Sequence, residues 1–261
     1  LLAAGFRLRQ EDREVEAKGP RVEAAYDSDG KPTRALEGFA RAQGVDPGEI
    51  RRVMTPKGEC VAARRRVEGR SAAEVLSEAI PAIVGSIPFG KTMKWGEGSF
   101  RFARPIHWVV CLLGPGIVPF QVAGIGSGRT SRGARFEGSL PLEIPDAADY
   151  LDLLRKASVI VDIAERRERI LSSLQEACGR IGKGVRVEDH PELIEAVNGM
   201  VEFPVGCPGE FDRDFLDLPG PVLSTAMIHH QRFFPVRGAG GELVPRYVAI
   251  LNCRADPRVV E

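Results

Sequence analysis

The sequence predicts an α+β fold with mixed antiparallel sheets and interspersed helices. Segments rich in β-branched and aromatic residues occur in pairs joined by turns, a pattern typical of hairpins. Stretches with the apolar period of helices lie between these pairs and do not alternate regularly with single strands. Regular βαβ winding is therefore not expected, and a chain of 261 residues has room for two packed subdomains.

The first expected domain, residues 1–140, combines strands and helices with basic and aromatic loops. Thr33 and Ser71 are the expected N-caps of its helices, and Gly44 is the expected stop of the first helix. The strands are expected at residues 6–16, 50–54 and 60–68, and the helices at residues 33–44 and 71–87.

Two further segments of this domain are expected to form strands. The apolar run at residues 106–114 predicts a strand buried on both faces, with Trp108 in the core. Residues 117–138 are expected to form a strand, a glycine-rich loop and a second strand. The segment PLEIPDA then breaks the pattern, which places a domain boundary near residue 140.

The second expected region, residues 141–261, contains a long amphipathic helix and a C-terminal hairpin. Its helices are expected at residues 148–157, 163–182, 190–200 and 221–231. Its strands are expected at residues 159–162, 201–205, 232–236 and 247–251.

Composition limits the classes of partner. Basic and acidic residues number 36 each, so any binding to nucleic acid must rest on local patches. No run reaches the ~18 apolar residues of a membrane helix, and the first residues lack the pattern of a signal peptide, so no membrane partner is expected. Five cysteines without a CxxC pair predict neither a disulfide framework nor a zinc site, and favour a cytoplasmic location.

Residues of catalytic type are scattered, and we assign no catalytic or metal-binding residue. The sequence contains no HExxH, GxSxG or Cys–His constellation. The adjacent His229 and His230 would point about 100° apart on a helix, so they do not chelate one metal together. The glycines of residues 124–128 lead into no helix, and FGKT at 89–92 lacks the upstream glycine of a phosphate-binding loop.

Three segments gather cations among glycine, hydroxyl or aromatic residues. The segment ARRRVEGR, at residues 63–70, is either a nucleic-acid patch or a charged strand edge. The loop at residues 126–136 either wraps a phosphate backbone or is a plain basic loop. In residues 86–108, Trp95 either stacks on a base or packs in the core. The cations of the last two segments are Lys91, Lys94, Arg101, Arg104, Arg129, Arg132 and Arg135.

Five segments in collinear order resemble the beta subunit of the bacterial two-subunit glycine–tRNA ligase. Each motif alone is weak, but five in register are specific. Gln231 and Arg232 lie where the family has a DQKYFPV-like hairpin and join the candidates for tRNA or partner contact, while Ala134 and His230 depart from the family pattern. The segments are GPRVEAAYDSDGKPTRALEGFARAQG (19–44), IPFGKTMKWGEGSFRFARPIHW (87–108), SGRTSRGARF (127–136), the series from MVEFPV to MIHHQRFFPV (200–236) and LVPRYVAILN (243–252).

The resemblance implies an accessory role. In this family the catalytic core, with its ATP, Mg and glycine sites, belongs to the alpha subunit, so no cofactor is expected in this chain. The implied partners are the glycyl-tRNA synthetase alpha subunit and tRNA-Gly, within a cytoplasmic heterotetramer that does not bind DNA. The resemblance also implies that the chain corresponds to the N-terminal half of the beta subunit, so the HD-type and anticodon-binding domains of the family are not expected in it.

Two other functions stay open. One is a standalone hydrolase or editing-type enzyme that uses His107 or His229 and His230, for which a bell-shaped pH–rate profile is expected. The other is a purely structural assembly module without tRNA contact.

Overall fold

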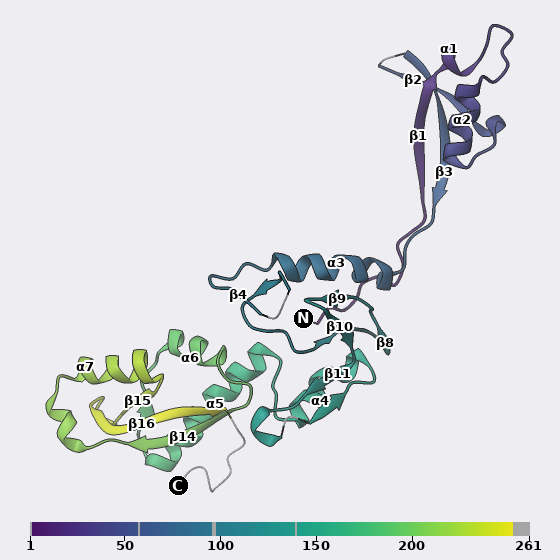
Figure 1. Ribbon diagram of the computed structural model, residues 1–261. Helices are drawn as coiled ribbons and strands as arrows, with labels where there is room; N and C mark the ends of the chain where they lie inside the picture. Colours follow the sequence, from purple (N-terminus) through teal and green to yellow (C-terminus); the bar gives the residue numbers. More distant parts are fainter. Residues whose placement is uncertain (1, 57, 96–97, 139, 253–261) are drawn as a thin grey trace. The chain divides into compact units, whose positions relative to one another are not determined.

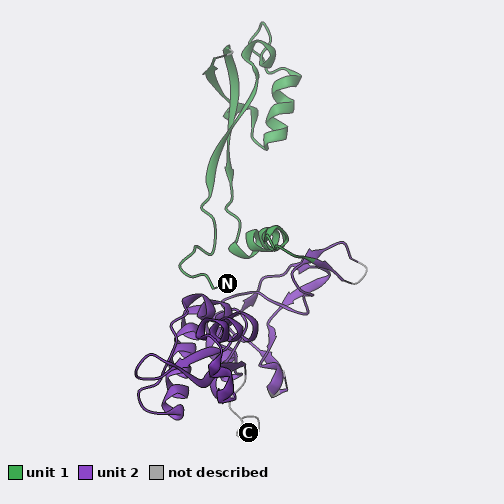
Figure 2. Ribbon diagram, turned by 90° about the vertical axis from the view of Figure 1, so that its left-hand side faces the viewer, with its two compact units in different colours: residues 1–92 green, residues 93–261 purple. Residues whose placement is uncertain are grey.

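The computed structural model describes residues 2–56, 58–95, 98–138 and 140–252. The chain divides into two compact units, Leu1–Thr92 and Met93–Glu261, which Figure 2 shows in green and purple. Each unit contains helices and antiparallel strand pairs, which confirms the predicted α+β class. The boundary expected near residue 140 falls inside the second unit, where strands on either side of it pair.

The first unit contains a three-stranded antiparallel sheet of order β1–β3–β2 (Figure 1). The expected hairpin forms, but the first strand begins later than expected. The reason is that every second residue begins to be partly buried only at Val15, and this pattern continues through Ala17 to Gly19. The strands are β1 (Arg13–Arg21), β2 (Arg51–Thr55) and β3 (Gly58–Val67).

Helix α2 (Arg34–Gln43), with the short α1 (Val22–Ala25), covers one face of this sheet (Figure 1). The predicted stop is confirmed, because Gly44 is left-handed with a φ of 67°. Thr33 holds the N-cap position without capping the helix, since its hydroxyl donates a hydrogen bond of 2.6 Å to the Ala24 carbonyl. A 3-10 turn, η1 (Pro47–Glu49), leads into β2. The core of the unit is formed by Ala25, Leu36, Ala40, Ile50 and Val61.

Helix α3 (Ala72–Ser86) begins at the predicted cap. Ser71 Oγ accepts a hydrogen bond of 3.2 Å from the Glu74 N–H, and the Glu74 carboxylate accepts one of 2.8 Å from the Ser71 N–H. This reciprocal pair is a capping box, which satisfies two backbone donors at the helix start. Pro81 lies inside the helix, and none of the α3 residues is buried.

The second unit begins with short strand pairs. The apolar run predicted as one buried strand is divided, because Cys111 changes strand partners. Its N–H donates to the Gly128 carbonyl at 3.2 Å, and its carbonyl accepts from the Val118 N–H at 3.0 Å. The prediction that Trp108 lies in the core is wrong, since this residue is 45% exposed. The strands are β4 (Met93–Lys94), β5 (Arg101–Phe102), β6 (Val109–Val110), β7 (Leu112–Leu113), β8 (Gly116–Ile117), β9 (Gln121–Val122), β10 (Ile125–Gly128), β11 (Thr130–Arg132) and β12 (Pro141–Glu143).

The remainder of this unit holds a four-stranded sheet of order β13–β15–β16–β14. Figure 1 labels its strands β14, β15 and β16. Residues 159–162 are not the expected strand but a connection, in which the Ile160 N–H bonds the Glu202 carbonyl at 2.9 Å. The helices are α4 (Tyr150–Lys156), α5 (Ile163–Ile181), α6 (Pro191–Asn198), α7 (Gly220–Thr225) and the π-helix η5 (Ala226–Gln231), with 3-10 turns η2 (Arg135–Glu137), η3 (Ala147–Asp149) and η4 (Arg213–Asp217). The strands are β13 (Arg186–Val187), β14 (Pro204–Glu210), β15 (Phe234–Arg237) and β16 (Leu243–Asn252).

The long helix α5 packs on this sheet and completes its core. Asp162 caps the helix by accepting hydrogen bonds from the Ala164 and Glu165 N–H groups. A side chain at Gly206 would place its Cβ 2.3 Å from the Ser173 carbonyl oxygen, so α5 and β14 approach as closely as their backbones allow. The buried residues of this core are Ile170, Leu174, Ala177, Cys178, Leu193, Ile194, Val197, Val201, Ile228, Phe234, Val236 and Val248.

Candidate nucleic-acid interface

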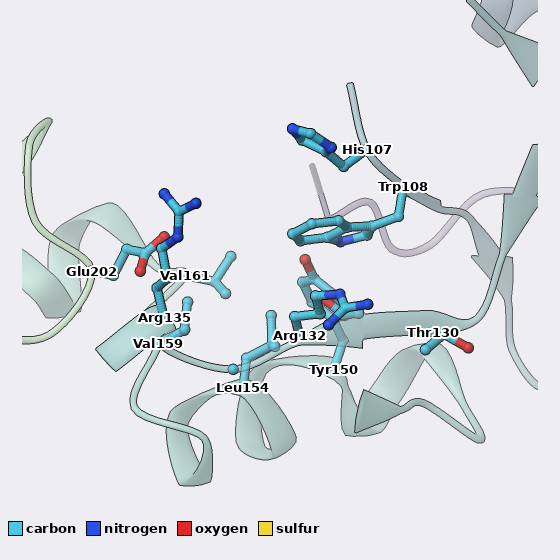
Figure 3. Close-up of a pocket in the computed structure, with 12 residues that line it drawn as sticks. His107, Trp108, Thr130, Arg132, Arg135, Tyr150, Leu154, Val159, Val161 and Glu202 are labelled. Atoms are coloured by element: carbon cyan, nitrogen blue, oxygen red, sulfur yellow. The ribbon is translucent and has the colours of Figure 1, made fainter. Parts of the chain in front are cut away.

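A pocket of about 810 Å³ lies in the second unit (Figure 3). It brings together residues 107–108, β11 with the segment that follows it, helix α4, the connection at 159–161 and Glu202. Two of the basic residues singled out from the sequence, Arg132 and Arg135, line it together with Trp108. The other lining residues are His107, Thr130, Ser131, Gly133, Tyr150, Leu154, Val159, Val161 and Glu202.

One end of the pocket is aromatic and cationic. The guanidinium carbon of Arg132 lies 5.9 Å from the centre of the Trp108 ring, a cation–π distance. The His107 ring lies beside the same indole, with 6.3 Å between ring centres. Both His107 and Trp108 are exposed, so their rings face the pocket with much of their surface uncovered.

Close backbone packing holds the loop that carries the two arginines. A Cβ at Gly133 would lie 2.8 Å from Ala157 Cβ, so only glycine fits against the end of α4 at this distance. The Ala134 N–H bonds the Ala157 carbonyl at 2.9 Å. Because this anchor lies between Arg132 and Arg135, it fixes the backbone from which both side chains reach the pocket.

An apolar floor connects the two ends. Leu154 is buried, while Val159 and Val161 are half-buried, and Figure 3 shows these three between Trp108 and the opposite end. Burial raises the pKa of Tyr150, whose ring lies below Trp108.

Arg135 and Glu202 occupy the opposite end of the pocket, so this end offers a cation and a carboxylate. Neither Tyr150 nor Glu202 stood out in the sequence, because nothing local links them to residues 107–108.

Arg129 has a different role from its neighbours. Its guanidinium donates hydrogen bonds to the Pro145 carbonyl at 3.2 Å and to the Pro115 carbonyl at 2.9 Å. Arg129 is not among the residues that line the pocket. It therefore joins two loops, and we place it in the structural frame of the unit.

The cations of residues 86–108 are not among the residues that line the pocket. Lys91 belongs to the first unit, and Lys94 pairs with Arg101 in the register of β4 and β5. Trp95 is half-buried and packs edge-on against Phe100, with 6.1 Å between ring centres. Arg104 is exposed and, like Lys94 and Arg101, is not among the residues that line the pocket.

The candidates near the C-terminal hairpin lie apart from the pocket. Gln231 ends the π-helix, and Arg232 has a left-handed φ of 60° and donates to the Ile228 carbonyl at 3.4 Å. His229 and His230 are exposed on the same turn and do not line the pocket. Among the described residues, no group of three or more His, Cys, Asp or Glu could hold a metal ion.

Residues 63–67 of the basic run ARRRVEGR lie on β3 beyond Ala62, where the pairing with β2 ends. They pair with β1 alone, so this part of the run is a charged strand edge, as one of the two interpretations expected. Arg64 approaches Glu16 at 3.5 Å and Arg66 approaches Asp12 at 2.6 Å. Hydrogen bonds from the Gly69 N–H and the Arg66 guanidinium lower the pKa of Asp12. These acidic partners offset much of the positive charge of the run.

A cationic surface that the sequence did not indicate lies on the sheet face opposite α2, and we call it the open face. Lys18 and Arg51 both pair with Ala62, so they flank one small residue on this face. Arg21 pairs with Cys60 in the next row. Within the described part of the chain, no carboxylate lies within ion-pair distance of these three cations. Strand alternation in β1 was the signal that could have found them.

Comparisons with known proteins identify the chain. The family model of the glycyl-tRNA synthetase beta subunit matches residues 1–261. Glycine–tRNA ligase beta subunits from Syntrophus aciditrophicus and Geobacter sp. strain M21 are 41% and 42% identical over 261 residues, all of this chain and 38% of each relative. The one from Nitratidesulfovibrio vulgaris is 41% identical over 253 residues, 97% of this chain and 36% of the relative. The chain thus spans little more than a third of these relatives.

These similarities place the chain among the components of aminoacyl-tRNA synthetases, which are ligases. More particularly, the chain belongs to the glycyl-tRNA synthetase beta subunit family. No helix in the described part of the chain is both long and apolar enough to cross a membrane.

Proposed function

We propose that this chain is an accessory part of a glycyl-tRNA synthetase, which binds tRNA-Gly and assembles with the catalytic alpha subunit in a cytoplasmic heterotetramer. The observation that carries the proposal is the pocket that joins Trp108 to Arg132 and Arg135 in a chain of this family. Aromatic faces and guanidinium groups are the side chains that proteins use to stack bases and to contact phosphates.

ATP, Mg and glycine are assigned in this proposal to the alpha subunit. The pocket of this chain supplies binding groups and brings no nucleophile together with a general base by a hydrogen bond among its described residues. The chain would therefore raise the affinity for tRNA and orient it, while the chemistry takes place on the partner. Neither DNA nor a membrane is proposed as a partner.

Glycylation kinetics of the full beta subunit with its alpha subunit test the tRNA contact. The double substitution of Arg132 and Arg135 by Gln should raise the KM for tRNA-Gly and leave the KM for glycine unchanged, because only tRNA binding is weakened. Arg186→Gln is the matched control, since Arg186 is an exposed arginine on β13 outside the pocket. An unchanged KM for tRNA in the double variant would contradict the proposal.

Light-scattering chromatography tests the assembly. A mixture of this chain with the alpha subunit should elute as one complex if residues of this chain form part of the interface. Two separate peaks would show that this chain carries no sufficient interface. If tRNA binding in filter assays were also missing, a hydrolytic role would replace the proposal, whereas a co-eluting complex without tRNA binding would favour a purely structural assembly module.

A further inference from the structure

We propose that the pocket takes one unstacked nucleotide of an RNA strand, and that it selects a base with an exocyclic amino group. This inference rests on the proposed function, since it names the part of the RNA that the pocket recognises. The ligand is a base with its flanking phosphate, and Glu202 is the residue that reads the amino group.

The size and shape of the pocket suit such a ligand. Its volume of about 810 Å³ falls within the ~300–1,000 Å³ of sites for small ligands. The floor of Leu154, Val159 and Val161 is apolar, one end is aromatic, and charged groups lie at both ends (Figure 3). A nucleotide has the same division, with a flat, weakly polar face on the base and charge on the phosphate.

The aromatic end offers a stacking surface that is exposed to solvent. Trp108 is 45% exposed although it lies in a hollow, and a large exposed indole is a common stacking platform for unpaired bases. Arg132 lies over the same ring at 5.9 Å and adds a second planar group on which a base can stack. A base inserted here would cover apolar surface that is now in contact with water.

The opposite end offers one cation and one anion to a ligand. Within the described residues, neither the Arg135 guanidinium nor the Glu202 carboxylate has a side-chain hydrogen-bond or ion-pair partner. The guanidinium can bind a phosphate through two N–H donors. The backbone of Glu202 is fixed, because its N–H donates to Asn252 Oδ1 at 2.7 Å and its carbonyl accepts from the Ile160 N–H at 2.9 Å.

The carboxylate makes the pocket selective. An ionised carboxylate only accepts hydrogen bonds, so it favours the amino groups of cytosine, adenine and guanine. Uracil has no amino group, and its single ring N–H lies between two carbonyl oxygens that a carboxylate repels, so uracil is the weaker ligand at Glu202. A pocket that bound only phosphate would need no carboxylate and would not distinguish the bases.

Fluorescence of Trp108 reports directly on the pocket. The chain has two tryptophans, so Trp95→Phe leaves Trp108 as its single indole and keeps an aromatic ring against Phe100. The probes are tetranucleotides of cytidine, adenosine or uridine, with cytidine monophosphate as a free-nucleotide arm. We expect saturable quenching by the cytidine and adenosine probes at concentrations at least about fivefold lower than by the uridine probe.

Substitutions at two exposed residues test the roles of the carboxylate and the guanidinium separately. Circular dichroism checks that each variant folds. Glu202→Gln should remove the preference over uridine, because an amide both donates and accepts, and Arg135→Gln should weaken all three probes alike. Arg186→Gln should change neither the preference over uridine nor the affinity for the three probes. Equal binding of the three probes to the parent chain, or no quenching at all, would overturn the inference.

Filter binding of tRNA separates this inference from the proposed function. If tRNA binds tightly but the tetranucleotides do not quench Trp108, the nucleotide pocket is wrong and tRNA binding stands. If the tetranucleotides bind with the expected preference but tRNA does not bind, the pocket is right and the proposed function fails. Stronger quenching by cytidine monophosphate than by the cytidine tetranucleotide would identify a free nucleotide as the ligand and overturn the RNA assignment.

Discussion

The Arg132 guanidinium lies over the Trp108 indole because strand pairing brings two separate segments together. Val109 pairs with Ser127 in the parallel register of β6 and β10, and Trp108 and Arg132 flank these strands. The cation–π contact is thus a product of sheet register, and a single segment of sequence does not contain it. This contact defines the end of the pocket at which we expect RNA to stack.

Trp108→Ala should weaken tRNA binding by roughly 5- to 150-fold, which corresponds to the loss of one stacked base. The thermal unfolding temperature should change less than for a core residue, because 45% of the Trp108 surface is exposed. Filter binding and a thermal melt measure the two effects. Phe215→Ala, which removes another exposed ring, is the control and should leave the affinity unchanged. Equal loss in both variants would argue against stacking at Trp108.

The open face should contribute phosphate contacts if it meets RNA. Replacing Lys18 and Arg51 by Gln should make tRNA binding less dependent on salt, because fewer counterions are released from the RNA. The slope of log affinity against log salt should decrease by up to about one for each lost contact. Binding isotherms at several salt concentrations measure the slope. Arg41 is exposed on α2, and Arg41→Gln should leave the slope unchanged.

Gly133→Ala should destabilise the second unit and distort the pocket. The new Cβ would lie 2.8 Å from Ala157 Cβ and 2.9 Å from the Ala157 carbonyl oxygen, so α4 or the loop must move. Overpacking of this kind costs about 1–3 kcal/mol in the free energy of unfolding. Denaturant unfolding measures the loss. A Cβ at Gly126 meets no atom within 4 Å, so Gly126→Ala should be nearly neutral. Similar losses of stability in both variants would show that the contact of Gly133 with Ala157 is not the cause.

Acid should weaken the second unit through Glu188. Burial raises the pKa of this carboxyl, but hydrogen bonds from His190 and Arg237 outweigh burial, so the net pKa lies below its ordinary 4.5. A carboxyl with a depressed pKa in the folded state stabilises above pH 4.5, and this stabilisation is lost as the pH falls through the folded-state pKa.

Glu188→Gln tests this assignment through the pH dependence of unfolding. The variant should melt below the parent at neutral pH, and the two melting temperatures should converge in acid. Thermal melts between neutral pH and pH 3 follow the difference. A constant difference across this range would assign the loss to packing and not to the charge of Glu188.

The sequence predicted the elements well where a local signal decides them. Ser71 and Gly44 delimit helices as their capping chemistry requires, and the β15–β16 hairpin forms as expected. The strand prediction for residues 106–114 failed because hydrogen bonds from distant residues divide the run at Cys111. Local patterns carry no information about such partners.

The candidate site could be predicted only in part, for the same reason. Arg132 and Arg135 follow from their spacing in a glycine-rich loop. Arg129 has the same spacing, yet its guanidinium bonds two loop carbonyls, and only the fold reveals that role. Glu202 reaches the pocket through the backbone contact with Ile160, which no motif contains.

The hydrogen bond from the Glu202 N–H to Asn252 also sets an order of events during synthesis of the chain. The Phe203 N–H bonds the same Asn252 oxygen, at 3.0 Å. A ribosome that has released the aromatic and basic segments has not yet produced the strand that holds Glu202 in place. The backbone at Glu202 should therefore stay unanchored in a nascent chain until β16 has emerged, so the pocket is completed only late in synthesis.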